Sequence, residues 1–314
     1  MWYCSSLILE CGGLKRIIGI DIGRKKCSVI HADFDGNGFR ILQKVIFLLE
    51  ADYNTAELAI ERLDELLHMY DFEAIGISCS GPLDSKNGIL ISPQYLPGWS
   101  NLRLKEHFEE KFGVPCQLHH DVNACALAEW KLGAGKGMEN LVYLTFGTEL
   151  DSGLILNGKL YIGANDMAGE IGQIRLSKHA TADDFCSSDG IRNMTFKKLD
   201  ELKELGIEHP LQKKGKYLSA FDVFEAAKQG DKLAMQIIRT SAEKLGHLVA
   251  CIADFLNPEA VIIGNYYARN AEVLLPIIRE VVEREANPIA STLKILPSKL
   301  GDSIWDLGAL MCAL

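Results

Sequence analysis

The chain has 314 residues, 48% of them hydrophobic and 24% charged, an ordinary composition for a globular protein of about two domains. Its formal net charge of −9 and its lack of a basic block argue against nucleic acid as a partner, because duplex binding needs clustered lysine and arginine. The longest apolar runs, such as 261–264, fall well short of the ~20 residues of a membrane helix, so we expect no membrane partner either.

The nine cysteines are scattered along the chain, and no two of them have the spacing Cys-x-x-Cys. Disulfide frameworks and zinc clusters show paired spacings, so we interpret these residues as reduced thiols packed as small hydrophobic side chains. The segment Met1–Gly13 lacks the basic head and the long apolar stretch of a signal peptide, and we interpret it as a short extension. These features predict a cytoplasmic protein without structural zinc.

The first part of the chain predicts strands that alternate with helices. Apolar strands are expected at five places: 16–20, 27–31, 39–47, 73–78 and 114–118. Leucines at helical spacing between charged residues predict an amphipathic helix over 55–69, and a second helix over 102–112 is expected to end at Gly113. Strands followed by crossover helices indicate a largely parallel or mixed sheet with helices packed on it.

A pattern of strand, glycine, polar turn and strand occurs twice. It is first seen around Gly23, and it returns around Gly147, 124 residues later. Helices are predicted beyond the first part over 121–133, 271–286 and 302–313, and the stretch 219–255 is predicted to be helical with a break at Gly230 and Asp231. Strands are predicted at 141–146, 153–156, 259–264 and 293–296.

This repeat predicts a duplicated α/β fold of two lobes with a central cleft. We place the N-terminal lobe over 1–118, closed by the C-terminal helix 302–314, and the C-terminal lobe over 119–301. Glycine lets backbone N–H groups approach phosphate oxygens closely, so two such turns facing each other could hold the phosphate tail of a nucleotide. Ordinary tight turns are the alternative interpretation.

Asp121 stands between a predicted strand and a predicted helix. Open α/β sheets bind their ligands at the carboxyl ends of strands, and a carboxylate there could accept a proton from an attacking hydroxyl. Aspartate is equally suited to the N-cap of the helix that follows, so both interpretations stay open.

His119 and His120 could suggest a metal, but adjacent histidines on an extended segment point to opposite faces. No further ligand stands at a metal-binding spacing, so we expect no metal ligands in this chain. Glu170 is flanked by Gly169 and by Gly172 two residues on, which fits a loop that approaches a ligand. A solvated loop acid is the alternative.

Five segments form a pattern that no single one of them would establish: Ser92–Trp99, His120–Ala124, Gly169–Gly172, Pro258–Gly264 and Leu307–Ala309. In this order and spacing they resemble the ROK family (repressor, open reading frame, kinase), and the likeness runs from about Lys15 to the end of the chain. The resemblance implies the two-lobed actin/hexokinase-like (ribonuclease H-like) fold. Similar proteins are commonly dimers, which implies a homodimer.

The resemblance also implies a chemistry, the transfer of the γ-phosphoryl group of ATP to a sugar hydroxyl with Mg²⁺ and an aspartate base. By this match Asp121 is the catalytic base. The residues implied at Mg-ATP are Asp21, Gly23, Lys26, Gly147, Thr148 and Gly264. The residues implied at the sugar are Gly81, Tyr95, His120, Glu170 and Gln173.

The two phosphate loops depart from the family pattern. Arg24 and Lys25 replace a glycine and a threonine in the first loop, and Glu149 and Asp151 replace glycines in the second. Carboxylates repel a phosphate tail, so the second loop is less suited to a triphosphate. One hypothesis is that the new cations and the new acids pair with each other across the cleft. Independent drift in an unused site is the alternative.

The sugar and adenosine motifs depart as well. Tyr95 and His120 stand where the family has asparagines, and Gln173 stands where it has a histidine. The Cys-rich zinc motif of the family is absent, with only Cys186 in that region, and the glycine-rich adenosine loop has become Gly264–Tyr267.

Two functions follow from this pattern. The first is a kinase for a hexose or amino-sugar hydroxyl, because Asp21, Lys26, Asp121, Thr148 and Glu170 are kept. The second is a non-catalytic relative, a pseudokinase that binds carbohydrate or acts as a regulator or scaffold. The family's transcriptional repressors carry a helix-turn-helix domain ahead of the first hairpin, where about fifteen residues stand here, so the resemblance does not favour that branch.

Overall fold

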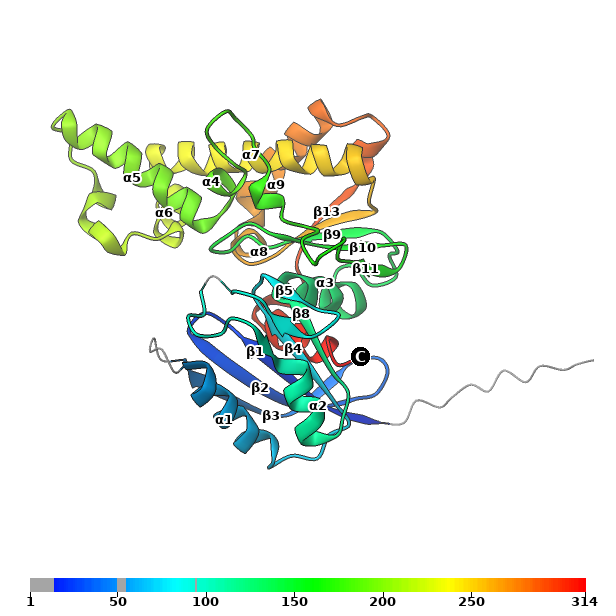
Figure 1. The fold of residues 1–314 in the computed structure, drawn as a ribbon. Coiled ribbons are helices and arrows are strands. Elements are labelled where there is room, and N and C mark those ends of the chain that lie inside the picture. Colours follow the sequence, from blue (N-terminus) through cyan, green and yellow to red (C-terminus); the bar gives the residue numbers. More distant parts are fainter. Residues whose placement is uncertain (1–13, 50–54, 94) are drawn as a thin grey trace, which may run out of the picture. The chain divides into compact units, whose positions relative to one another are not determined.

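A computed structural model of the chain describes residues 14–49, 55–93 and 95–314 (Figure 1). The expected extension Met1–Gly13, and Gln94 within the ROK-like segment, lie outside the described residues. The chain divides into two compact units. Unit 1 comprises Met1–His119 together with Ala309–Leu314, and unit 2 comprises His120–Gly308.

Unit 1 is built on a five-stranded sheet with the order β3-β2-β1-β4-β8 (Figure 1). Its strands are β1 (Lys15–Ile22), β2 (Lys26–Phe34), β3 (Phe39–Leu48), β4 (Ala74–Cys79) and β8 (Cys116–His120). Strand β1 pairs antiparallel with β2 and parallel with β4. The central β1 is buried over its last six residues, whereas the edge strand β3 is mostly exposed, as expected for a sheet covered by helices.

Two helices and a small sheet complete unit 1. Helices α1 (Thr55–Leu67) and α2 (Leu104–Phe112) bury Leu63 and Phe108 in one core together with the apolar side chains of β1 and β4. Gly113 ends α2 in the left-handed conformation, with φ of 68°, as its position after the predicted helix suggests. The small sheet contains β5 (Leu83–Asp84), β6 (Ile89–Leu90) and β7 (Leu102–Arg103).

Unit 2 repeats this sheet, with the order β11-β10-β9-β12-β13 (Figure 1). Its strands are β9 (Leu141–Leu144), β10 (Ser152–Leu156), β11 (Lys159–Tyr161), β12 (Ala260–Ile263) and β13 (Lys294–Pro297). As in unit 1, the first three strands pair antiparallel, β9 with β10 and β10 with β11. The middle strand β9 then pairs in parallel with β12, which pairs in parallel with β13. The predicted duplicated α/β fold is therefore confirmed.

Helices cover both faces of the unit 2 sheet. The helices of this part of the chain are α3 (Asp121–Leu132), α4 (Asp183–Cys186), α5 (Ser188–Glu204), α6 (Ala220–Lys228), α7 (Lys232–Leu256), α8 (Tyr266–Arg269), α9 (Ala271–Glu285) and α10 (Ile304–Met311), whose last residues belong to unit 1. Short 3-10 helices are η1 (Ile171–Gln173), η2 (Pro210–Tyr217), η3 (Ala290–Thr292) and η4 (Gly301–Ser303). Along β9, Val142 and Leu144 join the core of α7 and α9, while Leu141 and Tyr143 join the core of α3. This alternation follows from the two-residue period of a strand.

None of the helices in the described ranges has both the length and the apolar character needed to cross a membrane.

Candidate functional site

His120 and Asp121 lie where β8 ends and α3 begins. His120 occupies the N-cap position of α3, so Asp121 is not the N-cap that its sequence position allowed but the first residue of the helix. The Oδ1 atom of Asp121 accepts the Val122 backbone N–H at 2.7 Å and lies 3.0 Å from Nδ1 of His120. Burial acts to raise the pKa of Asp121, but His120 and the Val122 N–H outweigh it, so the pKa is lowered and the carboxyl is ionised.

Asp151 reaches the same place from the β9–β10 hairpin. Its backbone is fixed by Thr145, whose N–H donates to the Asp151 carbonyl at 2.9 Å and whose Oγ1 accepts the Asp151 N–H at 3.0 Å. Gly153 lets β10 pack tightly on α3, because a Cβ there would lie 2.8 Å from the Val122 carbonyl oxygen. As a result Oδ2 of Asp151 lies 3.8 Å from Nδ1 of His120.

Glu170 is brought in by a third segment, the loop before η1. The backbone N–H and the hydroxyl of Ser152 both donate to the Gly169 carbonyl, at 3.0 and 2.7 Å. Gly169 has φ of +107°, and a side chain there would collide with the Ser152 carbonyl oxygen. This close contact, which needs glycine, places Glu170 beside Asp151.

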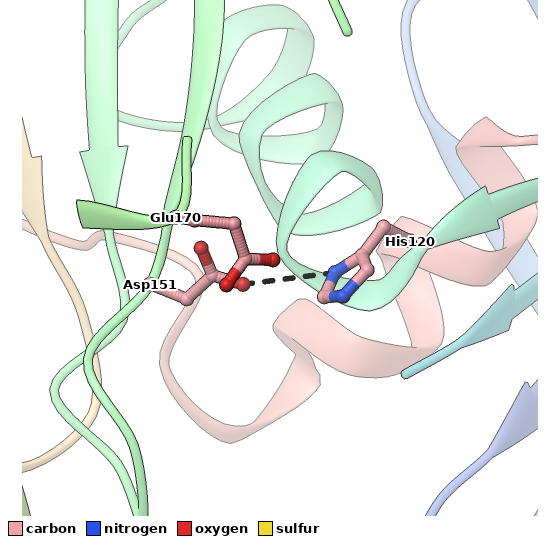
Figure 2. A group of neighbouring side chains, drawn as sticks. All are labelled: His120, Asp151 and Glu170. Carbon is pink, nitrogen blue, oxygen red and sulfur yellow. Dashed lines mark ion pairs between the residues drawn. The ribbon is translucent and has the colours of Figure 1, made fainter. Parts of the chain in front are cut away.

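The three segments converge, as Figure 2 shows, with Asp151 and Glu170 on one side and His120 on the other. One ligand atom from each of these residues lies within 4.8 Å of the other two. We call His120, Asp151 and Glu170 the triad; Asp121 adjoins it through His120.

The charges of this site are strongly coupled. Burial acts to lower the pKa of His120, but Asp121, Asp151 and Glu170 outweigh it and raise the pKa to about 9. Burial raises the pKa of Asp151 to about 7, and the negative charges of Glu170 and Asp121 add to this increase. Three carboxyl groups therefore share one imidazolium, and their oxygens can accept hydrogen bonds from hydroxyl groups or hold a cation.

In unit 1, the turn between β1 and β2 carries the residues that were predicted to bind phosphates. Asp21 is buried and accepts the Ser78 hydroxyl at 2.9 Å, and the Gly23 N–H donates to the Lys26 carbonyl at 3.0 Å to close the turn. Arg24, Lys25 and Lys26 are exposed at this turn. A buried carboxylate next to exposed cations fits a Mg²⁺-bound polyphosphate.

The corresponding turn in unit 2 fits a polyphosphate less well. The Gly147 carbonyl accepts the Ser188 N–H at 2.7 Å, and Thr148 and Glu149 are exposed at the tip of the turn. The Leu150 N–H donates to the Asp183 carboxylate at 2.7 Å, which fixes the base of the turn. Glu149 places a negative charge at the tip, where a phosphate group would need N–H donors or cations.

Gly264 has a packing role. A Cβ at this position would collide with the Tyr143 hydroxyl, so β12 and β9 need glycine here. The Tyr266 N–H donates to the Phe146 carbonyl at 3.3 Å, and a Cβ on Gly147 would lie 3.2 Å from Nδ2 of Asn265. The structure thus brings the Gly147 turn and the expected adenosine loop together within unit 2.

The remaining predicted residues are distributed between the units. In unit 1, the Arg24 guanidinium lies over the Tyr95 ring at 4.4 Å, and Gly81 follows β4. In unit 2, the exposed Gln173 ends η1, and its N–H donates to the Glu170 carbonyl at 3.1 Å. Arg24 and Lys25 lie in unit 1, whereas the acids with which they were expected to pair, Glu149 and Asp151, lie in unit 2. This pairing stays a prediction.

Asp151 is the residue of this cluster whose place the sequence did not indicate. Its sequence context suggested a carboxylate in a phosphate loop, whereas its nearest cation within unit 2 is His120. Gly153 and Gly169 stand where segments touch, as does Gly172, but a glycine in the sequence does not indicate its contact partner.

The family model, the similar sequences and the similar solved structures all indicate the same family. The model of the ROK family matches residues 17–314. A glucokinase of Thermotoga maritima is 30% identical over 94% of this chain and 96% of its own length, and a xylose repressor of Caldicellulosiruptor bescii is 31% identical over 94% and 77%. The solved structure of a ROK family glucokinase from Streptomyces griseus in complex with glucose and AMPPNP is 26% identical, with a TM-score of 0.74 over 96% of this chain and 99% of that chain.

Proposed function

Because the chain belongs to the ROK family, we propose that it is a sugar kinase, which transfers a phosphoryl group from ATP to a hydroxyl of a hexose or an amino sugar. The observation that carries this proposal is the ionised Asp121 carboxylate at the start of α3. It lies 3.0 Å from His120, and the charge of Glu170 acts on the same histidine. A carboxylate in this state can accept a proton, and its neighbours can accept or donate hydrogen bonds to several hydroxyl groups of one sugar.

In this proposal Asp121 accepts the proton of the attacking sugar hydroxyl. Its lowered pKa keeps it charged at neutral pH, which is the required protonation state, and most of the catalysis would come from positioning and charge. Glu170 and His120 would orient the sugar. When bound, ATP supplies the phosphoryl group; Asp21, Gly23 and Lys26 of unit 1 would hold its Mg²⁺-bound phosphates.

In unit 2 the proposed nucleotide residues are Gly147, Thr148 and Gly264. Gly147 and Thr148 would contribute backbone N–H groups at the turn. Gly264 would line the adenosine side, next to Tyr266, whose ring is stacked on Phe224 with centroids 6.3 Å apart.

A non-catalytic sugar-binding regulator is the second candidate, and two observations favour it. The imidazolium of His120 pairs with Asp121 and thereby weakens it as a base, and Glu149 stands exposed at the unit 2 phosphate turn. One of the similar proteins is a xylose repressor.

Calorimetric titration with Mg²⁺–ATP, with and without a mixture of hexoses and N-acetylhexosamines, tests the proposal. We expect nucleotide binding in the micromolar to low-millimolar range, followed by sugar phosphate that mass spectrometry detects. Heat from sugar alone, with no nucleotide binding at millimolar ATP, would contradict the kinase and support the regulator.

A further inference from the structure

The triad of His120, Asp151 and Glu170 has the composition of a metal site. It offers one imidazole nitrogen and two carboxylate oxygens from three separate segments, all within 4.8 Å of one another. Zinc sites with three protein ligands use nitrogen and oxygen donors of this kind and leave a further position open. We propose that the triad binds one divalent transition-metal ion, with Zn²⁺ as the reference ion.

The geometry needs only small side-chain movements to close around an ion. Donors about 2.1 Å from a tetrahedral ion are about 3.4 Å apart. The His120 Nδ1 to Asp151 Oδ2 distance is already 3.8 Å. The backbone of each carboxylate is fixed, since Ser152 holds Gly169 by two hydrogen bonds and Gly153 packs β10 on α3. Closure around an ion would therefore use rotation of side chains whose ligand atoms lie within 4.8 Å of one another.

A second observation concerns the imidazole itself. Nδ1 of His120 is inaccessible to solvent, and no group in the described part of the chain is aligned for a hydrogen bond with it, although Asp121 lies 3.0 Å away and Asp151 3.8 Å away. A buried polar atom without an aligned partner is unfavourable, and it faces the carboxylates with which it would share an ion. A metal ion at Nδ1 would take the place of the imidazole proton that now pairs with Asp121, and the proton would be released to solvent.

The donor set indicates which class of ion is bound. Mg²⁺ takes oxygen ligands and keeps much of its water, whereas an imidazole beside carboxylates suits Zn²⁺ and neighbouring transition metals. The expectation of no metal ligands came from spacing along the chain, and such spacing does not report donors that meet from three segments.

This inference goes beyond the proposed kinase, and it uses two of the proposed sugar residues, His120 and Glu170, so an ion and a sugar would compete for them. The test is therefore made without sugar or nucleotide, on protein freed of any histidine tag. Zn²⁺ affinity is measured by competition with a chromogenic chelator, and Co²⁺ is added in parallel to record its visible absorption bands. We expect one ion per chain and Co²⁺ bands of the strength typical of low coordination numbers.

Variants of the triad decide whether the ion binds there. His120→Gln and Asp151→Asn should each weaken Zn²⁺ binding by at least ~10-fold and remove the Co²⁺ bands. His209→Gln is the matched control, because His209 forms a histidine–carboxylate pair with Asp231 at 3.0 Å elsewhere in unit 2, and it should leave the affinity unchanged. If Asp151→Asn does not fold by circular dichroism, Glu170→Gln replaces it.

Two results would overturn the metal site: no Zn²⁺ binding by the native chain, or equal binding by the native chain and the folded triad variants. Zinc binding that depends on the triad, in a chain without kinase activity, would support the metal site and contradict only the proposed function. Kinase activity without Zn²⁺ binding would do the reverse.

Discussion

The proposed reaction depends on one carboxylate, Asp121, and this makes it testable by a single change. Asp121→Asn keeps the shape of the side chain and removes the proton acceptor, so turnover should fall by about 10²–10⁴-fold while sugar binding is largely kept. Phosphate-transfer assays and sugar titration measure the two effects separately. Asp200→Asn, a change of an exposed aspartate in the same unit, is the control. Full activity in Asp121→Asn would remove Asp121 from its proposed role.

Cysteine reactivity gives a prediction that does not depend on the function. Burial, helped by the charge of Glu109, raises the pKa of Cys116 to about 12, and because only the thiolate is nucleophilic, Cys116 should stay unreactive at pH 8–9. Cys251 is exposed and should react with iodoacetamide in the native protein. Peptide mapping by mass spectrometry distinguishes the two sites. Labelling of Cys116 as fast as that of Cys251 without denaturant would contradict the burial described here.

The sequence shows which single residues are candidates for the site better than it shows which residues they contact. His120, Asp121 and Glu170 stand out because they follow a strand or lie in a glycine-flanked loop. The place of Asp151 depends on contacts of Gly153 with α3 and of Gly169 with Ser152, which join positions far apart in the chain. Such contacts follow from packing and have no local pattern.

Among the elements, the loop before η1 depends on one glycine. Gly169→Ala combines a positive φ with a collision against the Ser152 carbonyl, so it should lower the free energy of unfolding by about 2–5 kcal/mol and displace Glu170. Gly206→Ala is the matched control: it has φ of +71° but no atom within 4 Å of the added Cβ, and should cost about 1–2 kcal/mol. Denaturant unfolding measures both. Equal costs would show that the contact with Ser152 is not tight.

Helix α3 is tied to the segment after β13 by Glu129. This fully buried carboxylate accepts the Ser298 hydroxyl at 2.5 Å and the Lys299 and Leu300 N–H groups at 2.9 and 3.0 Å, while its other oxygen accepts the Ala134 N–H at 2.7 Å. Glu129→Gln replaces one acceptor oxygen by a donor and should destabilise the protein by about 1–3 kcal/mol.

The matched control for this change is Glu283→Gln on the exposed face of α9, which we expect to stay within about 0.5 kcal/mol of the native protein. Thermal and urea unfolding compare the two variants. If they are equally stable, the hydrogen bonds of Glu129 do not contribute as the geometry indicates.

The regular elements could be predicted where a period or a capping residue is present. The helix predicted over 102–112 ends at Gly113 as expected, and the long predicted helical segment 219–255 breaks between α6 and α7, at Gly230 and Asp231. The N-cap of α7 is Asp231, whose side chain accepts the Ala234 N–H at 2.8 Å. The elements β11, α4 and α5 were not predicted, because this part of the chain has short strands and no strong apolar period.

At the scale of the whole molecule, the predicted actin/hexokinase-like fold is confirmed by the two sheets of equal strand order and by the likeness to a ROK family glucokinase structure. Repetition of the glycine hairpin after 124 residues was sufficient to predict this duplication. The sequence also predicts that the C-terminal helix 302–314 closes the N-terminal lobe. In the structure unit 1 is discontinuous and includes Ala309–Leu314, whereas residues 302–308 belong to unit 2.

That discontinuity leads to a prediction about the C-terminus. Gly76 of β4 and Gly19 of β1 admit this segment closely: a Cβ on Gly76 would lie 2.5 Å from the Ala313 nitrogen, and one on Gly19 would lie 2.8 Å from the Leu310 nitrogen. Leu310 is fully buried and Met311 is 8% exposed, and burial of two such side chains contributes about 3–6 kcal/mol, comparable to the stability of a domain.

Removal of residues 309–314 should therefore unfold unit 1, and hydrogen exchange should show loss of protection in β1 and β4 while α7 in unit 2 keeps its own. Removal of Leu314 alone, whose side chain is half exposed, is the control and should leave exchange unchanged. If β1 and β4 stay protected after the larger truncation, the strands and helices of residues 14–119 form a stable sheet without the returning chain. The glycines at 19 and 76 would then need another explanation, because the neighbours that they accommodate would no longer be required for folding.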